Sequence, residues 1–223
     1  METLAFGLIA IICLSVALLI RSVVKNNTKG LYFFKPLSTS LVILLCLLSL
    51  ARPGVNLNYT LIIAAALLFS LGGDIALMFN SELSFLLGLG LFLVVQVTYG
   101  LTFTWFNGFQ QQDFLLVLPV VIVISAAIYA FLYPGLGKMK LPVGCYVLIT
   151  TFMAWRAAAT LFGAAFPLLP ASLITAGAGL FYLSDVILAV NKFKRPFNWD
   201  IPLNLLTYYA AQLLIVLSAF CFS

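Results

Sequence analysis

Two aspartates lie inside hydrophobic segments that are long enough to cross a membrane, and their surroundings are alike. Asp74 is preceded by two glycines and Asp185 by Ser184, and aliphatic residues follow both. A carboxylate near the middle of an apolar span costs about 2.5–3.5 kcal/mol, so such a residue indicates a functional site. Two carboxyl groups that converge in a low dielectric cannot both ionise easily. We therefore expect Asp74 and Asp185 to be a catalytic pair, one a protonated acid and the other a carboxylate base.

Uncharged polar residues are expected at a similar depth in the neighbouring spans. Tyrosine and glutamine can position a hydroxyl, a water or a carboxyl group without bringing another charge into the membrane. The candidates for binding a substrate or supporting the aspartates are Gln96, Tyr99, Tyr146, Ser184, Tyr208, Tyr209 and Gln212. The alternative for any one of them is an ordinary interhelical hydrogen bond of modest worth.

Three basic residues lie close to the expected ends of spans. Lys35 and Lys140 are expected to start spans at the membrane surface, where either can bind a lipid phosphate as a point charge. The alternative is a lysine that only sets topology. Arg156 follows Trp155, and we expect it to be an interfacial anchor that points outward, away from the aspartates.

The chain contains no histidine and four cysteines without paired spacing. The absence of histidine excludes a Ser-His-Asp triad and an H-E-x-x-H zinc site. The cysteines all lie in apolar stretches, where they are expected to act as small buried hydrophobes. We therefore expect neither a metal nor an organic cofactor.

The composition is that of an all-α polytopic membrane protein. Of 223 residues, 64% are hydrophobic and 8% are charged, compared with about 45–50% and about 25% in soluble domains. Spans of about 17–25 apolar residues are predicted at 3–22, 36–51, 59–79, 84–106, 114–133, 141–161, 170–191 and 201–222. Residues 1–223 are expected to form a single transmembrane domain. The net charge of +5 does not indicate nucleic acid, because the basic residues fall in short loops.

The charges in those loops predict the orientation. Nine lysines and arginines fall in or beside the odd-numbered loops, whereas only Arg52 falls in the even-numbered ones. The positive-inside rule therefore places the odd-numbered loops in the cytoplasm and both termini outside. A chain this compact, with loops this short, is typical of a bacterial inner membrane.

The order of several residue pairs indicates an internal repeat. Lys35-Pro36 and Lys140-Leu141-Pro142 open the second and sixth spans, Asp74 and Asp185 close the third and seventh, and Thr-Tyr pairs lie in the fourth and eighth. An even number of spans in each half predicts a parallel 4+4 repeat, with halves at about 1–110 and 111–223. Both aspartates are then expected five or six residues from the cytoplasmic helix ends, facing a common axis. Chance similarity between apolar segments is the alternative.

Three functions remain open at this point. A carboxylate pair without histidine favours a hydrolase, and the same aspartates in a repeated fold are compatible with a small proton-coupled transporter. A third possibility is a lipid-binding protein in which the aspartates are structural. The oligomeric state is not indicated by any pattern.

The chain resembles the YhhN-like family of membrane proteins, which includes the lysoplasmalogenases. The resemblance is carried by Lys35-Pro36, Gly73-Asp74, the segment from Gly88 to Tyr99, Phe181-x-x-Ser184-Asp185 and Tyr208-Tyr209-Ala210-Ala211-Gln212. One departure is Gln96, where many relatives have histidine. If that histidine assists catalysis, Gln96 would weaken or redirect the activity, and if it only forms hydrogen bonds, glutamine can substitute for it.

The resemblance implies an eight-span enzyme that cleaves the vinyl-ether bond of a lysophospholipid. The products would be a fatty aldehyde and a glycerophospho-base, with Asp74 and Asp185 as the acidic residues. Acid protonation of a vinyl ether forms an oxocarbenium-like cation, as in carboxylate-pair glycoside hydrolysis. The partners implied are the lipid bilayer and a lysophospholipid that enters from the inner leaflet.

Overall fold

The computed structural model describes residues 2–195 and 197–222, and every regular element in that part of the chain is helical. Eight of its helical segments there are long and apolar enough to cross a membrane. Their helices are α1 (Glu2–Val24), α2 (Thr28–Leu48), α3 (Leu57–Ala76), α4 (Glu82–Asn107), α5 (Leu118–Leu132), α6 (Lys140–Ala159), α7 (Leu168–Phe193) and α8 (Asp200–Cys221). The fifth segment reaches this length only with the helical turns on either side of α5, over Asp113–Gly135. The predicted all-α class and the eight spans are confirmed, and the protein is an integral membrane protein.

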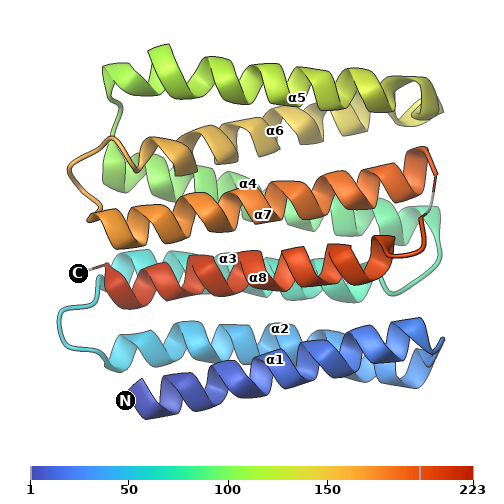
Figure 1. The fold of residues 1–223 in the computed structure, drawn as a ribbon, viewed down its shortest axis with the longest axis horizontal. Helices are drawn as coiled ribbons and strands as arrows, with labels where there is room; N and C mark the ends of the chain where they lie inside the picture. Colours follow the sequence, from blue (N-terminus) through green and yellow to red (C-terminus); the bar gives the residue numbers. More distant parts are fainter. Residues whose placement is uncertain (1, 196, 223) are drawn as a thin grey trace.

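The helices pack side by side in two layers, and the two layers pack against each other (Figure 1). Helix α1 packs on α2, α2 on α3 and α3 on α4, and in the second half α6 packs on α7 and α7 on α8. The two halves meet where α4 packs on α6 and where α8 packs on α1 and α2. Helix α5 lies at the edge of the bundle and packs mainly on α6 (Figure 1). Both marked chain ends lie at the end of the bundle opposite the odd-numbered connections (Figure 1).

Helix α2 begins eight residues earlier than predicted, which changes the position of Lys35. The side chain of Asn27 accepts a hydrogen bond from the backbone N–H of Gly30 at 3.2 Å and so caps a helix that begins at Thr28. Pro36 lies inside this helix instead of starting it. Lys35 therefore lies two turns inside α2 and is buried, and its predicted position at the start of a span is wrong.

The two aspartates lie at different distances from the ends of their helices. Helix α3 ends at Ala76, two residues after Asp74, and the apolar residues that follow form a turn. Helix α7 continues through Asn191 and Lys192 to Phe193, eight residues after Asp185. The predicted distance of five or six residues in both cases is wrong, because an apolar run and a helix need not end at the same residue.

Glycines allow the close helix contacts on which the site depends. A Cβ atom on Gly177 would lie 2.8 Å from the side chain of Ile215, so α7 and α8 approach too closely there for any larger residue. A Cβ atom on Gly73 would lie 2.8 Å from the ring of Phe92, which brings α4 against the turn of α3 that carries Asp74. Small residues at such positions are typical of membrane helices, whose association depends on close packing.

Candidate active site

Asp185 belongs to a hydrogen-bonded group that joins α7 to α4 and α6. The side-chain N–H of Gln96 donates to Asp185 Oδ2 at 2.6 Å and to the Tyr146 hydroxyl oxygen at 2.8 Å. The hydroxyl of Thr150 donates to Gln96 Oε1 at 2.6 Å, which fixes the orientation of the amide. All of these partners are neutral, and no lysine or arginine in residues 2–195 and 197–222 forms an ion pair with Asp185.

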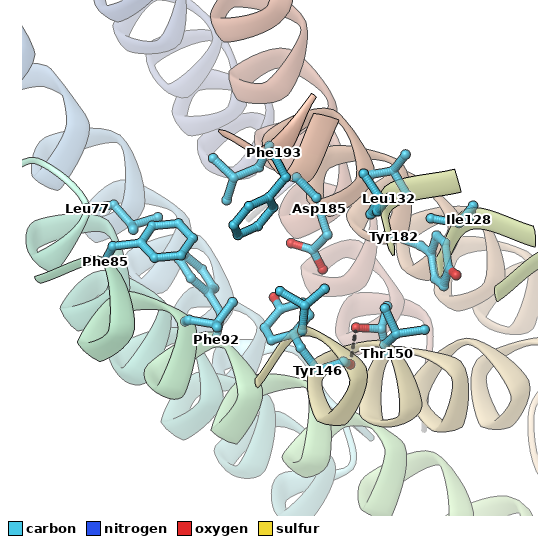
Figure 2. Close-up of a pocket in the computed structure, with 16 residues that line it drawn as sticks. Leu77, Phe85, Phe92, Ile128, Leu132, Tyr146, Thr150, Tyr182, Asp185 and Phe193 are labelled. Carbon is cyan, nitrogen blue, oxygen red and sulfur yellow. Dashed lines mark hydrogen bonds between the residues drawn. The ribbon is translucent and has the colours of Figure 1, made fainter. Parts of the chain in front are cut away.

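The Asp185 carboxyl faces a small cavity between α4, α6 and α7, with α5 at its outer side. The cavity has a volume of about 50 Å³, which is enough for a few water molecules. Its walls are otherwise mainly apolar, and Figure 2 shows the carboxyl group pointing into the space between Phe193, Phe92 and Tyr146. Asp185 is thus an acidic group at a mainly apolar cavity that has room for water.

Asp74 belongs to a different group, formed by α2, α3 and α8. Lys35 Nζ lies 3.4 Å from Asp74 Oδ1. Two hydroxyls donate to Asp74 Oδ2, that of Thr39 at 2.6 Å and that of Tyr208 at 2.8 Å. Asp74 is only 2% exposed and does not line the cavity at Asp185. It is a charge-balanced carboxylate enclosed by its partners.

The sequence analysis did not predict Thr39 or Thr150 as site residues, although the spacing of each could have indicated it. Thr39 lies one turn after Lys35, and Thr150 lies one turn after Tyr146, so each falls on the same helix face as a candidate residue. Thr39 also lies 3.2 Å from the Tyr209 hydroxyl, which in turn donates to the backbone carbonyl of Lys35 at 3.0 Å.

The remaining predicted residues lie outside these two groups. Tyr99 donates to Gln212 Oε1 at 2.9 Å, and Gln212 donates to Ser70 Oγ at 2.9 Å, which joins α4, α8 and α3. Ser184 donates to the backbone carbonyl of Phe181 at 2.9 Å and contacts neither aspartate side chain by a hydrogen bond. The bonds of Tyr99 and Gln212 are the ordinary interhelical bonds that the sequence left open as the alternative, whereas the bond of Ser184 lies within α7.

An aromatic cluster lies between the two aspartate groups. The rings of Phe92, Phe181 and Tyr208 pack edge to face with centroids 5.6–6.1 Å apart. Phe92 lines the cavity at Asp185, whereas Tyr208 binds Asp74. No hydrogen bond joins the two carboxyl groups in the described part of the chain, so they do not share a proton directly.

A second, larger hollow opens at the end of the bundle where the odd-numbered connections lie. Its volume is about 630 Å³, and it shares the side chains of Leu77, Phe85, Leu188 and Phe193 with the cavity. We call this hollow the vestibule. Lys35 lies in its wall, so the vestibule adjoins both aspartate groups.

Arg156 does not point outward, and that prediction is wrong. Its side chain is fully buried, with Nη1 2.8 Å from Asp113 Oδ2. Its other nitrogens donate to the Thr104 hydroxyl and to the Gly108 backbone carbonyl. This cluster lies at the opposite end of the bundle from the vestibule.

Lys140 is exposed, with Nζ 4.2 Å above the Tyr133 ring, and does not line the vestibule.

The sequence over residues 30–219 matches the model of the YhhN family. The chain belongs to the YhhN family. The resemblance to this family is therefore confirmed over most of the chain, including every residue of both aspartate groups.

Several named proteins are similar to this YhhN family member. The lysoplasmalogenase TMEM86A of Bos taurus is 39% identical over 160 residues, which cover 70% of this chain and 64% of the relative. The human lysoplasmalogenase TMEM86B is 34% identical over 73% of this chain and 65% of its own length. The uncharacterized membrane protein YhhN of Escherichia coli O157:H7 is 26% identical over 94% of this chain and 96% of its own.

The chain spans slightly less than two thirds of the length of the lysoplasmalogenase relatives. No solved structure matches it.

Proposed function

We propose that this protein is an intramembrane hydrolase that cleaves the vinyl-ether bond of lysoplasmalogens to a fatty aldehyde and a glycerophospho-base. The observation that carries the proposal is Asp185, a carboxyl group that has no cationic partner among the described residues and faces a mainly apolar cavity large enough for water. An uncompensated buried charge is costly, so this group favours its neutral, proton-bearing form. The named activity of the TMEM86A and TMEM86B relatives supports the same reaction.

The reaction begins when Asp185 transfers its proton to the vinyl carbon β to the ether oxygen. This step forms a C–H bond and leaves an oxocarbenium-like cation beside the Asp185 carboxylate, which stabilises it. A water molecule then adds to the α carbon and gives its proton to the same carboxylate. The resulting hemiacetal breaks its bond to the glycerol oxygen, which takes up the hydroxyl proton as the aldehyde forms. One water is consumed, and Asp185 ends protonated, as it began.

Gln96 and Tyr146 position the acid for this step. The amide of Gln96 is fixed by Thr150 and donates to Asp185 and to Tyr146. Because the donor to Asp185 is neutral, the Asp185 carboxyl group can be protonated before the proton transfer and negatively charged after it. Tyr146 lines the cavity and is placed to orient the attacking water.

Asp74 takes the other role, that of the ionised member of the two aspartates. Lys35 balances its charge at 3.4 Å, and two hydroxyl donors stabilise the carboxylate. Because Asp74 is enclosed, we assign it to holding Lys35 and α8 in place and not to contact with the reacting atoms. The two aspartates thus divide the acid and carboxylate roles without sharing a proton.

The substrate would lie with its headgroup in the vestibule and its vinyl ether at Asp185. The tail would pass between α5 and α7, which both line the cavity, towards the bilayer. With the odd-numbered connections in the cytoplasm, the substrate enters from the inner leaflet, and the membrane we propose is the bacterial inner membrane.

Hydrolysis in D₂O tests this reaction directly. Protonation of the vinyl carbon by Asp185, after exchange with solvent, places one deuterium on carbon 2 of the aldehyde, which mass spectrometry detects. In H₂¹⁸O the released glycerophospho-base should carry no label, because water attacks the carbon on the aldehyde side. Label in the glycerophospho-base, or an aldehyde without deuterium, would rule out the proposed route.

A further inference from the structure

The vestibule has a chemical character that the hydrolysis reaction alone does not require. The reaction needs an acid, a water molecule and an apolar cavity, and all three are present at Asp185. The vestibule is more than ten times larger than the cavity, and its lining combines apolar side chains with polar ones, among them two lysines, Lys35 and Lys192. Cations placed beside a cavity of this kind indicate a ligand with a negative charge at one end of an apolar chain.

The position of the Lys35 ammonium group suits it to bind a ligand in the vestibule. Lys35 is a buried cation, and its ammonium group reaches the vestibule with 11% of its side chain exposed. Of its three donors, one is directed to Asp74 at 3.4 Å, so two remain for a ligand. The hydrogen bond from Tyr209 to its backbone carbonyl fixes the α2 turn on which it lies.

Lys192 also lines the vestibule, from a position near the end of α7. Its Nζ lies 4.8 Å from the centre of the Phe85 ring, and Phe85 belongs to the wall that the vestibule shares with the cavity. The ammonium group is therefore held where the two spaces meet, two turns along the same helix from Asp185. It forms no ion pair within the described residues.

The vestibule also contains two acidic residues, Glu82 and Asp200, and neither forms an ion pair with Lys35 or Lys192 among the described residues. The Asp200 carboxylate is already bound by the side chain of Asn191 and by the backbone N–H groups of Phe197 and Ile201. Glu82 is exposed in the first turn of α4, where it would face the positive end of a zwitterionic headgroup.

We propose that Lys35 and Lys192 together bind the phosphate of the substrate headgroup, with Asp74 as the residue that positions Lys35. The inference rests on the proposed function and adds to it the class of ligand group that the vestibule selects. Two lysines on α2 and α7 bind the phosphate as point charges. The phosphate then fixes the distance from the headgroup to the vinyl ether at Asp185.

The test compares a phosphate-bearing substrate with one that lacks phosphate. Purified wild type, Lys192→Gln and the control Lys194→Gln are assayed on an alkenyl-glycerophosphocholine and on the matching alkenylglycerol. Lys194 follows directly at the end of the same helix but packs over Phe131 and does not line the vestibule. Both lysines are close to solvent, so both variants should fold.

The expected result is a KM about tenfold higher for the phosphate-bearing substrate in Lys192→Gln, which corresponds to one lost charge-assisted hydrogen bond. Its kcat and its activity on the alkenylglycerol should stay within about twofold of the wild type, because neither depends on the phosphate contact. All activities of Lys194→Gln should stay in the same range, because Lys194 does not line the vestibule. An equal loss on both substrates, or an equal effect of the two variants, would overturn the proposal.

A binding measurement separates this inference from the proposed function. A saturated alkyl-ether lysophospholipid contains no vinyl ether, and its dissociation constant can be measured by calorimetry whether or not the protein cleaves anything. Weaker binding to Lys192→Gln, with no competition from inorganic phosphate, supports the site even if no substrate is cleaved. Binding that is unchanged by Lys192→Gln overturns it, and competition by inorganic phosphate would reassign the site to a free anion.

Discussion

Asp185 and Asp74 differ in their neighbours although their sequence contexts are alike. Asp185 has neutral hydrogen-bond donors and faces a cavity, whereas Asp74 has a cation at 3.4 Å and is enclosed. The spacing of residues predicted two carboxyl groups at the same depth that face a common axis and form one acid–base pair. The structure instead gives each aspartate its own set of partners, because Lys35 lies inside α2 at the level of Asp74 and no lysine takes the matching position beside Asp185.

Gln96 should be necessary because of the N–H groups it donates. In Gln96→Leu the Asp185 and Tyr146 side chains lose their common donor, and Thr150 loses its acceptor. Loss of a positioned acid lowers kcat by about 100-fold or more. Gln96→His keeps a ring N–H that can reach Asp185, so we expect it to retain activity within about tenfold of the wild type. Steady-state aldehyde release measures both, and equal loss in the two variants would contradict this role.

The ion pair of Lys35 and Asp74 should show strong coupling in a double-mutant cycle. Lys35→Met leaves the Asp74 charge buried without a partner, which costs about 3–5 kcal/mol of the free energy of unfolding. Asp74→Asn in the same chain removes that charge and should recover most of the loss. Thermal unfolding in detergent measures the cycle. Additive losses in the double variant would show that the pair is not held as the structure places it.

Helix packing sets the positions of these side chains. Helix α7 carries Asp185 and lies directly against α8, which carries Tyr208 and Tyr209, and close approach at Gly177 fixes their spacing (Figure 1). On the same helix, a Cβ atom on Gly179 would meet nothing within 4 Å. The two glycines therefore form a matched pair for testing whether the spacing between α7 and α8 matters.

Gly177→Val should destabilise the protein and Gly179→Val should not. Overpacking at Gly177 forces α7 away from Ile215 and costs about 1–3 kcal/mol. The change at Gly179 lies in open space and should shift the unfolding temperature little. Because α7 would move with Asp185 on it, Gly177→Val should also lower activity. Similar unfolding temperatures for the two variants would contradict the packing of α7 on α8.

The whole molecule has two polar ends of different kinds. The vestibule end combines the aspartate groups with an open hollow, whereas the other end is closed by the buried pair of Arg156 and Asp113. Hydropathy predicted the eight spans because apolar length alone determines which segments can cross a membrane. It could not predict the pairing of Arg156 with Asp113 or of Lys35 with Asp74, because hydropathy does not show which faces two neighbouring helices turn towards each other.

The predicted repeat is supported by the helices that supply each aspartate group. Asp74 on α3 is bound from α2 and α8, and Asp185 on α7 lies in a group with α6 and α4. A shift by four helices converts the first set into the second, as a parallel 4+4 arrangement requires. The repeat stays a prediction, and so does the orientation in the membrane.

The orientation can be tested by labelling single cysteines from outside the cell. In a variant without the four native cysteines, Phe109→Cys marks an even-numbered connection and Ser81→Cys marks an odd-numbered one. Because the basic residues flank the odd-numbered connections, we expect a membrane-impermeant maleimide to label Phe109→Cys in intact cells. Ser81→Cys should react only after the membrane is opened, and the reverse pattern would place the vestibule outside.

The central claim is that Asp185 is the acid of a vinyl-ether hydrolase, and aldehyde release from a lysoplasmalogen tests it most directly. Purified wild type should release aldehyde. Folded Asp185→Asn should lose kcat by at least about 100-fold, whereas Asp74→Asn should act mainly on KM for the phosphate-bearing substrate. If the wild type releases no aldehyde from a lysoplasmalogen, or if Asp185→Asn keeps its kcat, the account is contradicted.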